Sequence, residues 1–200
     1  ILPIVLILLF VHQPFINADE PSSFNAIITE AKMAINEGFY DKAGDLLDRA
    51  EKLSPQRWEP NFIRGEMYYH EGLYEIAIVQ FKKAQDKGIK SEELYHNLAD
   101  SYGSIGMDKK AVKVYEEAFE KLYISKRLYE KLSWMYYKTH EVEKSIKIVQ
   151  EGLKEYPDSY DLLMTLGTLY SAVNNYKLSK KYYLDAIEQS QNAATNNFRA

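Results

Sequence analysis

Residues 94–118 read LYHNLADSYGSIGMDKKAVKVYEEA and hold two short amphipathic segments with a glycine between them. Leu94 and Leu98 share one helical face of the first segment, and Tyr115 falls on the apolar face of the second. Gly106 lies between the segments, where glycine ends a helix at low cost because it tolerates a positive φ angle. The stretch therefore predicts two antiparallel helices joined by a tight turn.

The same pattern recurs along the chain at a constant interval. Ala43, Ala77, Ala111, Ser145 and Ser179 follow one another at steps of 34 residues, with no insertion. A fixed interval of this length is typical of repeat proteins, in which each unit packs on its neighbours. The interval divides the chain into five units, 24–57, 58–91, 92–125, 126–159 and 160–193.

Other positions of the repeat support this frame. Equivalent positions of the five repeats form a column when the repeats are aligned. Two such columns hold only small side chains, which let paired helices approach closely. These columns are Ala31, Gly65, Ala99, Ser133, Gly167 and Ala50, Ala84, Ala118, Gly152, Ala186. A bulkier column fills the space beside them, with Leu47, Phe81, Tyr115, Val149 and Tyr183. The turn within each unit falls at Gly38, Gly72, Gly106, His140 and Asn174.

The interval and these columns resemble those of the tetratricopeptide repeat (TPR) family over residues 24–193. The resemblance implies an all-α fold, a right-handed α-solenoid of five helix–turn–helix hairpins. Glu30 and Arg64 depart from it, because they occupy a position where the family prefers a large apolar residue. The first repeat is therefore expected to be atypical. Residues 194–200 are expected to begin a further repeat or to form a frayed tail, with the reading frame continuing beyond them.

The first eleven residues, ILPIVLILLFV, form a continuous apolar run. The run is shorter than the about 20 residues of a membrane-spanning helix, and Ile16 and Ala18 suit the positions before a signal-peptide cleavage site. We therefore expect a signal peptide at residues 1–18, a short linker at 19–23, and export to the periplasm or outside a bacterial cell. The missing initiator Met indicates a start inside the reading frame. The alternatives are an uncleaved leader that anchors the protein in the membrane and a buried N-terminal element of the folded domain.

Composition narrows the function further. A net charge of −4 argues against a nucleic-acid partner, and the absence of cysteine excludes disulfides and thiolate chemistry. No hydrolase, kinase or nucleotide-binding motif is present, so we expect no enzyme activity, cofactor or small-molecule substrate. A metal site at His70 and His96, with Glu66 and Asp100, is the one alternative; polar groove residues are the simpler interpretation.

The resemblance also implies that the first helices of the repeats line a concave groove for a partner peptide or protein. On that pattern the groove is aromatic in the middle, acidic on one side and basic on the other. The candidate residues are Phe62, Glu66, Tyr69, His70, His96, Asn97, Asp100, Arg127, Lys131, Trp134, Tyr137 and Lys138. For Trp134 and Tyr137 the alternative is packing between neighbouring repeats.

Chaperone-binding members of the family hold a terminal carboxylate with five polar residues. Asn97, Arg127 and Lys131 match three of these positions, whereas Phe62 and Glu66 do not match the other two. A complete carboxylate clamp is therefore not expected. Arg127 and Lys131 lie one helical turn apart and could still bind an acidic group.

These observations favour a non-enzymatic scaffold that binds a partner protein or peptide within an extracytoplasmic envelope complex. One alternative is that the repeats are the substrate-recognition or regulatory part of a longer enzyme. Self-association is a third hypothesis. Contact with a membrane is expected only through an uncleaved leader.

Overall fold

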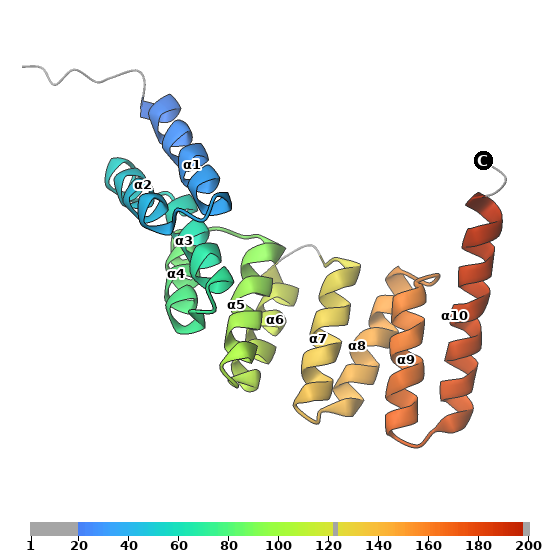
Figure 1. The fold of residues 1–200 in the computed structure, drawn as a ribbon. Coiled ribbons are helices and arrows are strands. Elements are labelled where there is room, and N and C mark those ends of the chain that lie inside the picture. The colour runs from blue at the N-terminus through green and yellow to red at the C-terminus, as the bar shows by residue number, and fades with distance from the viewer. Residues whose placement is uncertain (1–19, 122–123, 198–200) are drawn as a thin grey trace, which may run out of the picture. The chain divides into compact units, whose positions relative to one another are not determined.

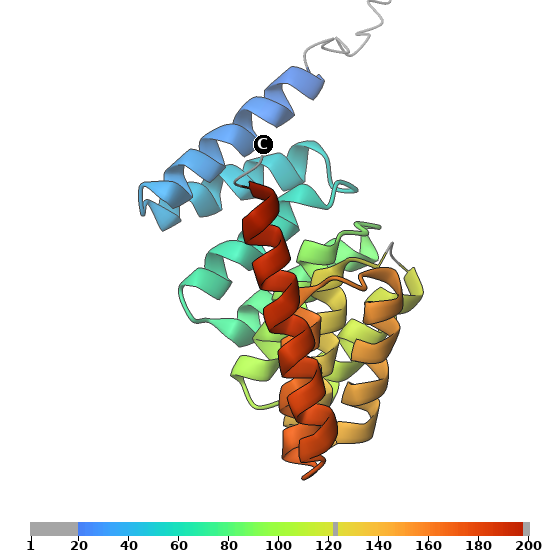
Figure 2. The same ribbon diagram turned by 90° about the vertical axis from the view of Figure 1, so that its right-hand side faces the viewer.

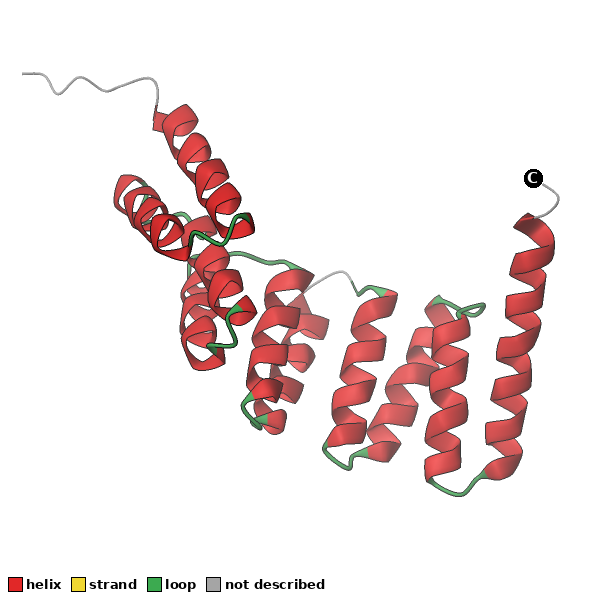
Figure 3. Cartoon of the chain, in the orientation of Figure 1, coloured by secondary structure: helices red, strands yellow, loops and turns green. Residues whose placement is uncertain are grey.

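The computed structural model describes residues 20–121 and 124–197, so the expected signal peptide lies outside the described residues. In these ranges the chain is helical and contains no strand (Figure 3). The helices are α1 (Glu20–Asn36), α2 (Tyr40–Leu53), α3 (Glu59–His70), α4 (Tyr74–Asp86), α5 (Glu92–Ser104), α6 (Asp108–Lys121), α7 (Lys126–Lys138), α8 (Val142–Glu155), α9 (Tyr160–Ala172) and α10 (Tyr176–Asn197).

The chain forms two compact units, Ile1–Pro55 and Gln56–Ala200. In the described part of the first unit, α1 packs against α2. The second unit holds four hairpins, α3–α4, α5–α6, α7–α8 and α9–α10, each closely packed within itself (Figure 1). Successive hairpins are joined by contacts of α4 with α5, α6 with α7 and α8 with α9, and Figure 2 shows the same stack with α10 in the foreground. Consecutive helices therefore pack in pairs, as predicted.

All five predicted turns adopt the left-handed backbone conformation. The φ angles are 80° at Gly38, 75° at Gly72, 75° at Gly106, 64° at His140 and 60° at Asn174. Glycine adopts this conformation without strain, and asparagine tolerates it better than most residues. The interpretation of these positions as hairpin turns is confirmed.

The small residues of the repeat are necessary because bulky rings lie against them. A Cβ atom added to Gly65 would lie 2.5 Å from Cε1 of Phe81. One added to Gly167 would lie 2.6 Å from Cδ1 of Tyr183. These distances confirm that the small column and the bulky column pack against each other within a hairpin.

A serine cap marks the start of the first helix in three hairpins, at α5, α7 and α9. The hydroxyl oxygens of Ser91, Ser125 and Ser159 accept hydrogen bonds from the backbone N–H groups three residues later, at 3.1, 3.2 and 3.3 Å. Such caps satisfy donors that have no partner within the helix. Because the three serines recur with the repeat, α5, α7 and α9 begin at equivalent positions.

The chain differs from expectation at both ends of the repeat array. α1 begins at Glu20, so most of the segment expected as a linker is helical. α10 continues through Asn197, so residues 194–197 extend the second helix of the last hairpin and begin no further one. Of the two atypical residues, Glu30 is exposed and pairs with Lys42 at 2.9 Å, whereas Arg64 is buried.

No helix in residues 20–121 or 124–197 combines the length and the apolar character needed to cross a membrane.

Candidate functional site

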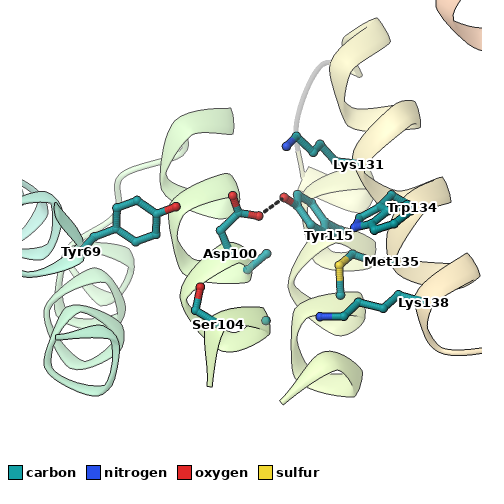
Figure 4. A pocket seen from close by; sticks show the side chains of 10 residues that line it. Tyr69, Asp100, Ser104, Tyr115, Lys131, Trp134, Met135 and Lys138 are labelled. Carbon is teal, nitrogen blue, oxygen red and sulfur yellow. Dashed lines mark hydrogen bonds between the residues drawn. The ribbon is translucent and has the colours of Figure 1, made fainter. Parts of the chain in front are cut away.

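A hollow of about 320 Å³ lies between the first helices α5 and α7. We call this space the first hollow (Figure 4). Its lining residues are Tyr69, Ala99, Asp100, Gly103, Ser104, Tyr115, Lys131, Trp134, Met135 and Lys138.

The floor of the first hollow is a hydrogen-bonded cluster. Tyr115 belongs to α6, and its hydroxyl lies 3.3 Å from Oδ1 of Asp100, to which it donates. The same hydroxyl lies 2.9 Å from Nδ1 of His96. Nε2 of His96 lies 3.4 Å from Oδ2 of Asp100.

Charge and burial act on this cluster in opposite directions. Burial lowers the pKa of His96, Asp100 opposes that shift, and the cations of Arg127 and Lys131 lower the pKa further. Burial also raises the pKa of Tyr115 well above its usual range, with the Asp100 carboxylate adding to the effect. At neutral pH the imidazole of His96 and the phenol of Tyr115 are therefore both neutral.

The opposite wall of the first hollow is basic. Lys131 and Lys138 extend from α7 toward α5 (Figure 4). Lys138 is paired with Asp108 at 2.7 Å, whereas Lys131 and Arg127 have no ion-pair partner among the described residues. The hollow thus places an acidic group on α5 across from uncompensated positive charge on α7.

Trp134 separates the first hollow from a second one. Its side chain is 58% exposed, and its ring lies 6.0 Å from that of Tyr137, tilted by 32°. The second hollow, of about 260 Å³, lies between α7 and α9. It is lined by Glu130, Ser133, Trp134, Tyr137, Met164, Thr165, Thr168 and Leu169. Tyr137 is 37% exposed, so neither aromatic ring is buried between repeats.

The structure brings together about half of the residues predicted from the sequence. Tyr69, Asp100, Lys131, Trp134 and Lys138 line the first hollow, and Tyr137 lines the second. His96 supports the floor from behind Asp100. The remaining predicted residues line neither hollow: Phe62, Glu66, His70, Asn97 and Arg127.

The placement of Phe62 in the groove is wrong. Its side chain is only 8% exposed and packs in the core, with its ring centroid 6.0 Å from that of Trp58 and 5.9 Å from that of Phe81. The equivalent positions in the next two repeats are His96 and Glu130. At this boundary between core and groove, the apolar ring turns inward, since burial of an aromatic side chain is favourable.

Tyr115 and Met135 line the first hollow, although the sequence indicated neither as a groove residue. Tyr115 stands in the packing column with Phe81 and Val149, and its ring is indeed buried. The hydroxyl of Tyr115 could have indicated this position in the sequence. A buried phenol requires a hydrogen-bond partner, and Asp100 is that partner.

A metal centre was an alternative for the histidines and carboxylates of the groove. In the described ranges, no group of three or more His, Asp or Glu side chains is arranged to hold a metal ion. The His70 ring packs beside that of Tyr69 at 5.7 Å, while His96 takes part in the hydrogen-bonded cluster.

Comparison with known proteins concerns both sequence and fold. No curated protein matches the sequence. A sequence model described as tetratricopeptide repeat matches residues 92–120 and 160–192, which contain the α5–α6 hairpin and most of α9–α10.

Solved structures of similar fold include three named proteins. MamA is 22% identical, with 82% of this chain and 96% of that chain covered and a TM-score of 0.71. YrrB, described as a TPR protein with an unusual peptide-binding site, is 17% identical, with coverages of 88% and 92% and a TM-score of 0.67. PilF of Pseudomonas aeruginosa is 14% identical, with coverages of 85% and 78% and a TM-score of 0.65. At these identities the likeness concerns the fold.

The matched segments coincide with helical hairpins of the predicted interval, and the similar structures share the all-helical architecture. The sequence model therefore identifies tetratricopeptide repeats in two hairpins of the chain, and the solved structures show the likeness of the fold.

Proposed function

We propose that this protein is a non-enzymatic scaffold that binds a segment of a partner protein across the two hollows. The TPR fold implies a scaffold for protein–protein interaction. The observation that supports the groove as the binding surface is Trp134, which is 58% exposed between the two hollows. Aromatic side chains at the centre of a binding surface contribute large contact area at low entropic cost.

The size of the hollows suits a polypeptide segment. Volumes of about 320 and 260 Å³ accommodate individual side chains and are too small for a folded domain. Their position on either side of one tryptophan suits side chains of one extended segment, which rises about 3.3 Å per residue. The walls belong to packed helices, so little entropy is lost on the receptor side when a partner binds. The peptide-binding description of YrrB is consistent with this use of the fold.

The charges of the first hollow indicate how a partner is oriented. Lys131 in the first hollow is free to pair with an acidic group, as is Arg127 one helical turn before it on α7, outside the hollow. Asp100 across the hollow can accept hydrogen bonds from a partner's donors. A complete carboxylate clamp is not part of the proposal, because Phe62 is in the core and Glu66 is acidic.

The proposal extends to organisation and location. We infer that all five hairpins act as TPR units, on the basis of the constant interval of 34 residues. The apolar run at residues 1–11 supports export and a role in an extracytoplasmic envelope complex. Fractionation of cells that produce the full-length protein tests export, and an intact leader found only in the cytoplasm would refute it.

Binding through the groove is tested by crosslinking and capture of the native partner from the envelope of the source cell. The double variant Trp134→Ala, Arg127→Ala is expected to lose the captured partner while its helical circular dichroism is unchanged. The matched control is Tyr176→Ala, Lys177→Ala, since both side chains are exposed and line neither hollow. Equal capture by the wild type and the groove variant would place the binding surface elsewhere.

A further inference from the structure

The second hollow combines aromatic walls with a carboxylate. The rings of Trp134 and Tyr137 form one side, and Met164 and Leu169 from α9 form the other. Glu130 is the acidic residue in this lining. A hollow of this kind can surround an aliphatic chain and still offer a negative charge at one edge.

The carboxylate of Glu130 is incompletely satisfied. Its Oε1 atom is buried and accepts no hydrogen bond from the described residues. The nearest cation, Nζ of Lys126, lies 3.8 Å away, which is too long for a hydrogen bond. Lys126 is instead held by Oδ2 of Asp161 at 2.6 Å. Two carboxylates thus share one ammonium group, which leaves one negative charge beside the hollow.

Three of the four hydroxyl groups in the lining, those of Ser133, Thr165 and Thr168, have already donated their protons within the protein; the fourth belongs to Tyr137. Thr165 donates to the backbone oxygen of Asp161 at 2.8 Å, and Thr168 donates to that of Met164 at 3.1 Å. Ser133 and Ser145 are 2.9 Å apart, and because Ser145 donates to the Ser133 carbonyl, Ser133 donates to Ser145. The hydroxyl groups of Ser133, Thr165 and Thr168, like the carboxylate of Glu130, can therefore only accept hydrogen bonds from a ligand.

We propose that the second hollow binds a basic side chain, the ammonium group of a lysine or the guanidinium group of an arginine, from the partner segment. Its charged end donates to Glu130, and its aliphatic stem lies against Trp134 and Met164. An aromatic ring attracts a cation to its face, and Trp is the strongest of the aromatic side chains in this respect. The inference rests on the proposed function, since it names one side chain of the segment bound in the groove.

Two further observations are consistent with a cation in this position. Burial raises the pKa of Glu130, opposed mainly by Lys126, so a second cation would relieve the cost of holding this carboxylate ionised. The first hollow would repel the same group at its α7 wall, where Lys131 and Lys138 lie. The α7 walls of the two hollows therefore differ in charge, with Lys131 in the first and Glu130 in the second.

The proposal is tested by titrating ¹⁵N-labelled protein with N-acetyl-lysine methylamide and N-acetyl-arginine methylamide. The chain has two tryptophans, so the Trp134 indole signal is assigned with a Trp134→Phe variant. The uncharged derivatives of norleucine and Nε-acetyl-lysine serve as probes of matched size. Both cationic probes should shift the Trp134 signal saturably and bind about threefold to tenfold more tightly than the uncharged ones.

Variants separate the charge of Glu130 from other causes. Glu130→Gln should remove most of the preference for the cationic probes, whereas Glu143→Gln, at an exposed position on α8, should leave it unchanged. Equal affinity for lysine and norleucine derivatives, or no saturable shift with either cation, overturns the proposal. So does a Trp134 signal that moves on dilution of the protein alone, because the hollow would then be a contact between two copies.

This titration uses no native partner, so its failure is distinguishable from failure of the proposed function. If the probes do not bind but the groove variant still loses the captured partner, the groove function stands and only the basic side chain is wrong. If the probes bind but the groove variant captures the partner normally, the hollow is a cation site outside the partner-binding surface.

Discussion

The hydroxyl of Tyr115 donates a hydrogen bond to Oδ1 of Asp100 at 3.3 Å, and it thereby joins a second helix to the groove-lining face of a first helix. The hydroxyl also contacts His96 at 2.9 Å, so one phenol satisfies two polar groups at the floor of the first hollow. Tyr115 is 1% exposed, so its hydroxyl has little access to water as a substitute partner. The cluster therefore contributes to stability and holds the groove carboxylate in position.

Replacement of Tyr115 by phenylalanine tests this role. Tyr115→Phe should lower the free energy of unfolding by about 1–2 kcal/mol, because a buried hydrogen-bonded hydroxyl is lost while the ring remains. Urea denaturation measures the change. Tyr160→Phe is the control, since Tyr160 is 45% exposed and should change stability by less than about 0.5 kcal/mol. Equal effects of the two substitutions would contradict the account.

Protonation of His96 should make stability depend on pH. Burial, with Arg127 and Lys131, lowers the pKa of His96 in the folded state below the value of about 6.5 in the unfolded chain. Between these two values the unfolded chain binds more protons, so stability is fully present above about pH 6.5 and is lost as the pH falls toward the folded pKa.

The wild type should therefore lose more free energy of unfolding between pH 7 and pH 5 than His96→Gln does. Urea denaturation at a series of pH values measures both proteins. The carboxylates of the chain titrate in both proteins, so the difference between their pH profiles reports on His96. Identical profiles would show that His96 has the same pKa in the folded and unfolded chain.

Close packing in the second hairpin predicts an unusual effect of alanine. Gly65→Ala should lower the free energy of unfolding by about 1–3 kcal/mol, because the new Cβ would lie 2.5 Å from Phe81. Gly103 is a helical glycine in α5, in the next hairpin, and the nearest atom to a Cβ added there is 3.9 Å away. Gly103→Ala should therefore be neutral or stabilising, as expected from helix propensity. Thermal and urea unfolding of both variants measure this contrast, which would vanish if Phe81 moved aside at no cost.

The turn at His140 contains a strained backbone. Its φ angle of 64° costs a residue with a Cβ atom about 1–2 kcal/mol, partly offset by the greater freedom of glycine in the unfolded chain. His140→Gly should therefore raise the free energy of unfolding by about 0.5–1 kcal/mol. His140→Ala keeps the Cβ atom and should give no gain, so a gain of similar size would assign the effect to the imidazole side chain.

The fold could be predicted from the sequence because each repeat has the same local structural requirements. Every turn needs a residue that tolerates a positive φ angle, and every hairpin needs small residues opposite a bulky one. Gly65 with Phe81 and Gly167 with Tyr183 meet that second requirement directly. Such requirements recur at each repeat, so the sequence shows them several times.

The candidate site could be predicted from the sequence only in part, because it depends on side chains that differ between repeats. The interval gives the helical face of Trp134, Lys131 and Asp100, and all three line the first hollow. The repeat interval does not predict which way a side chain points at the edge of the core, and there the ring of Phe62 points into the core. Nor does it show that the long side chain of Tyr115, which belongs to α6, reaches the first hollow.

The central claim is that a partner polypeptide lies across the groove beside Trp134. Photo-crosslinking in the source cell tests it, with benzoylphenylalanine placed at position 134, at Ser104 in the first hollow or at exposed Lys113 on α6. The account predicts that positions 134 and 104 crosslink to the same protein and that position 113 does not. Crosslinking of the partner from position 113, with none from position 134, would contradict it.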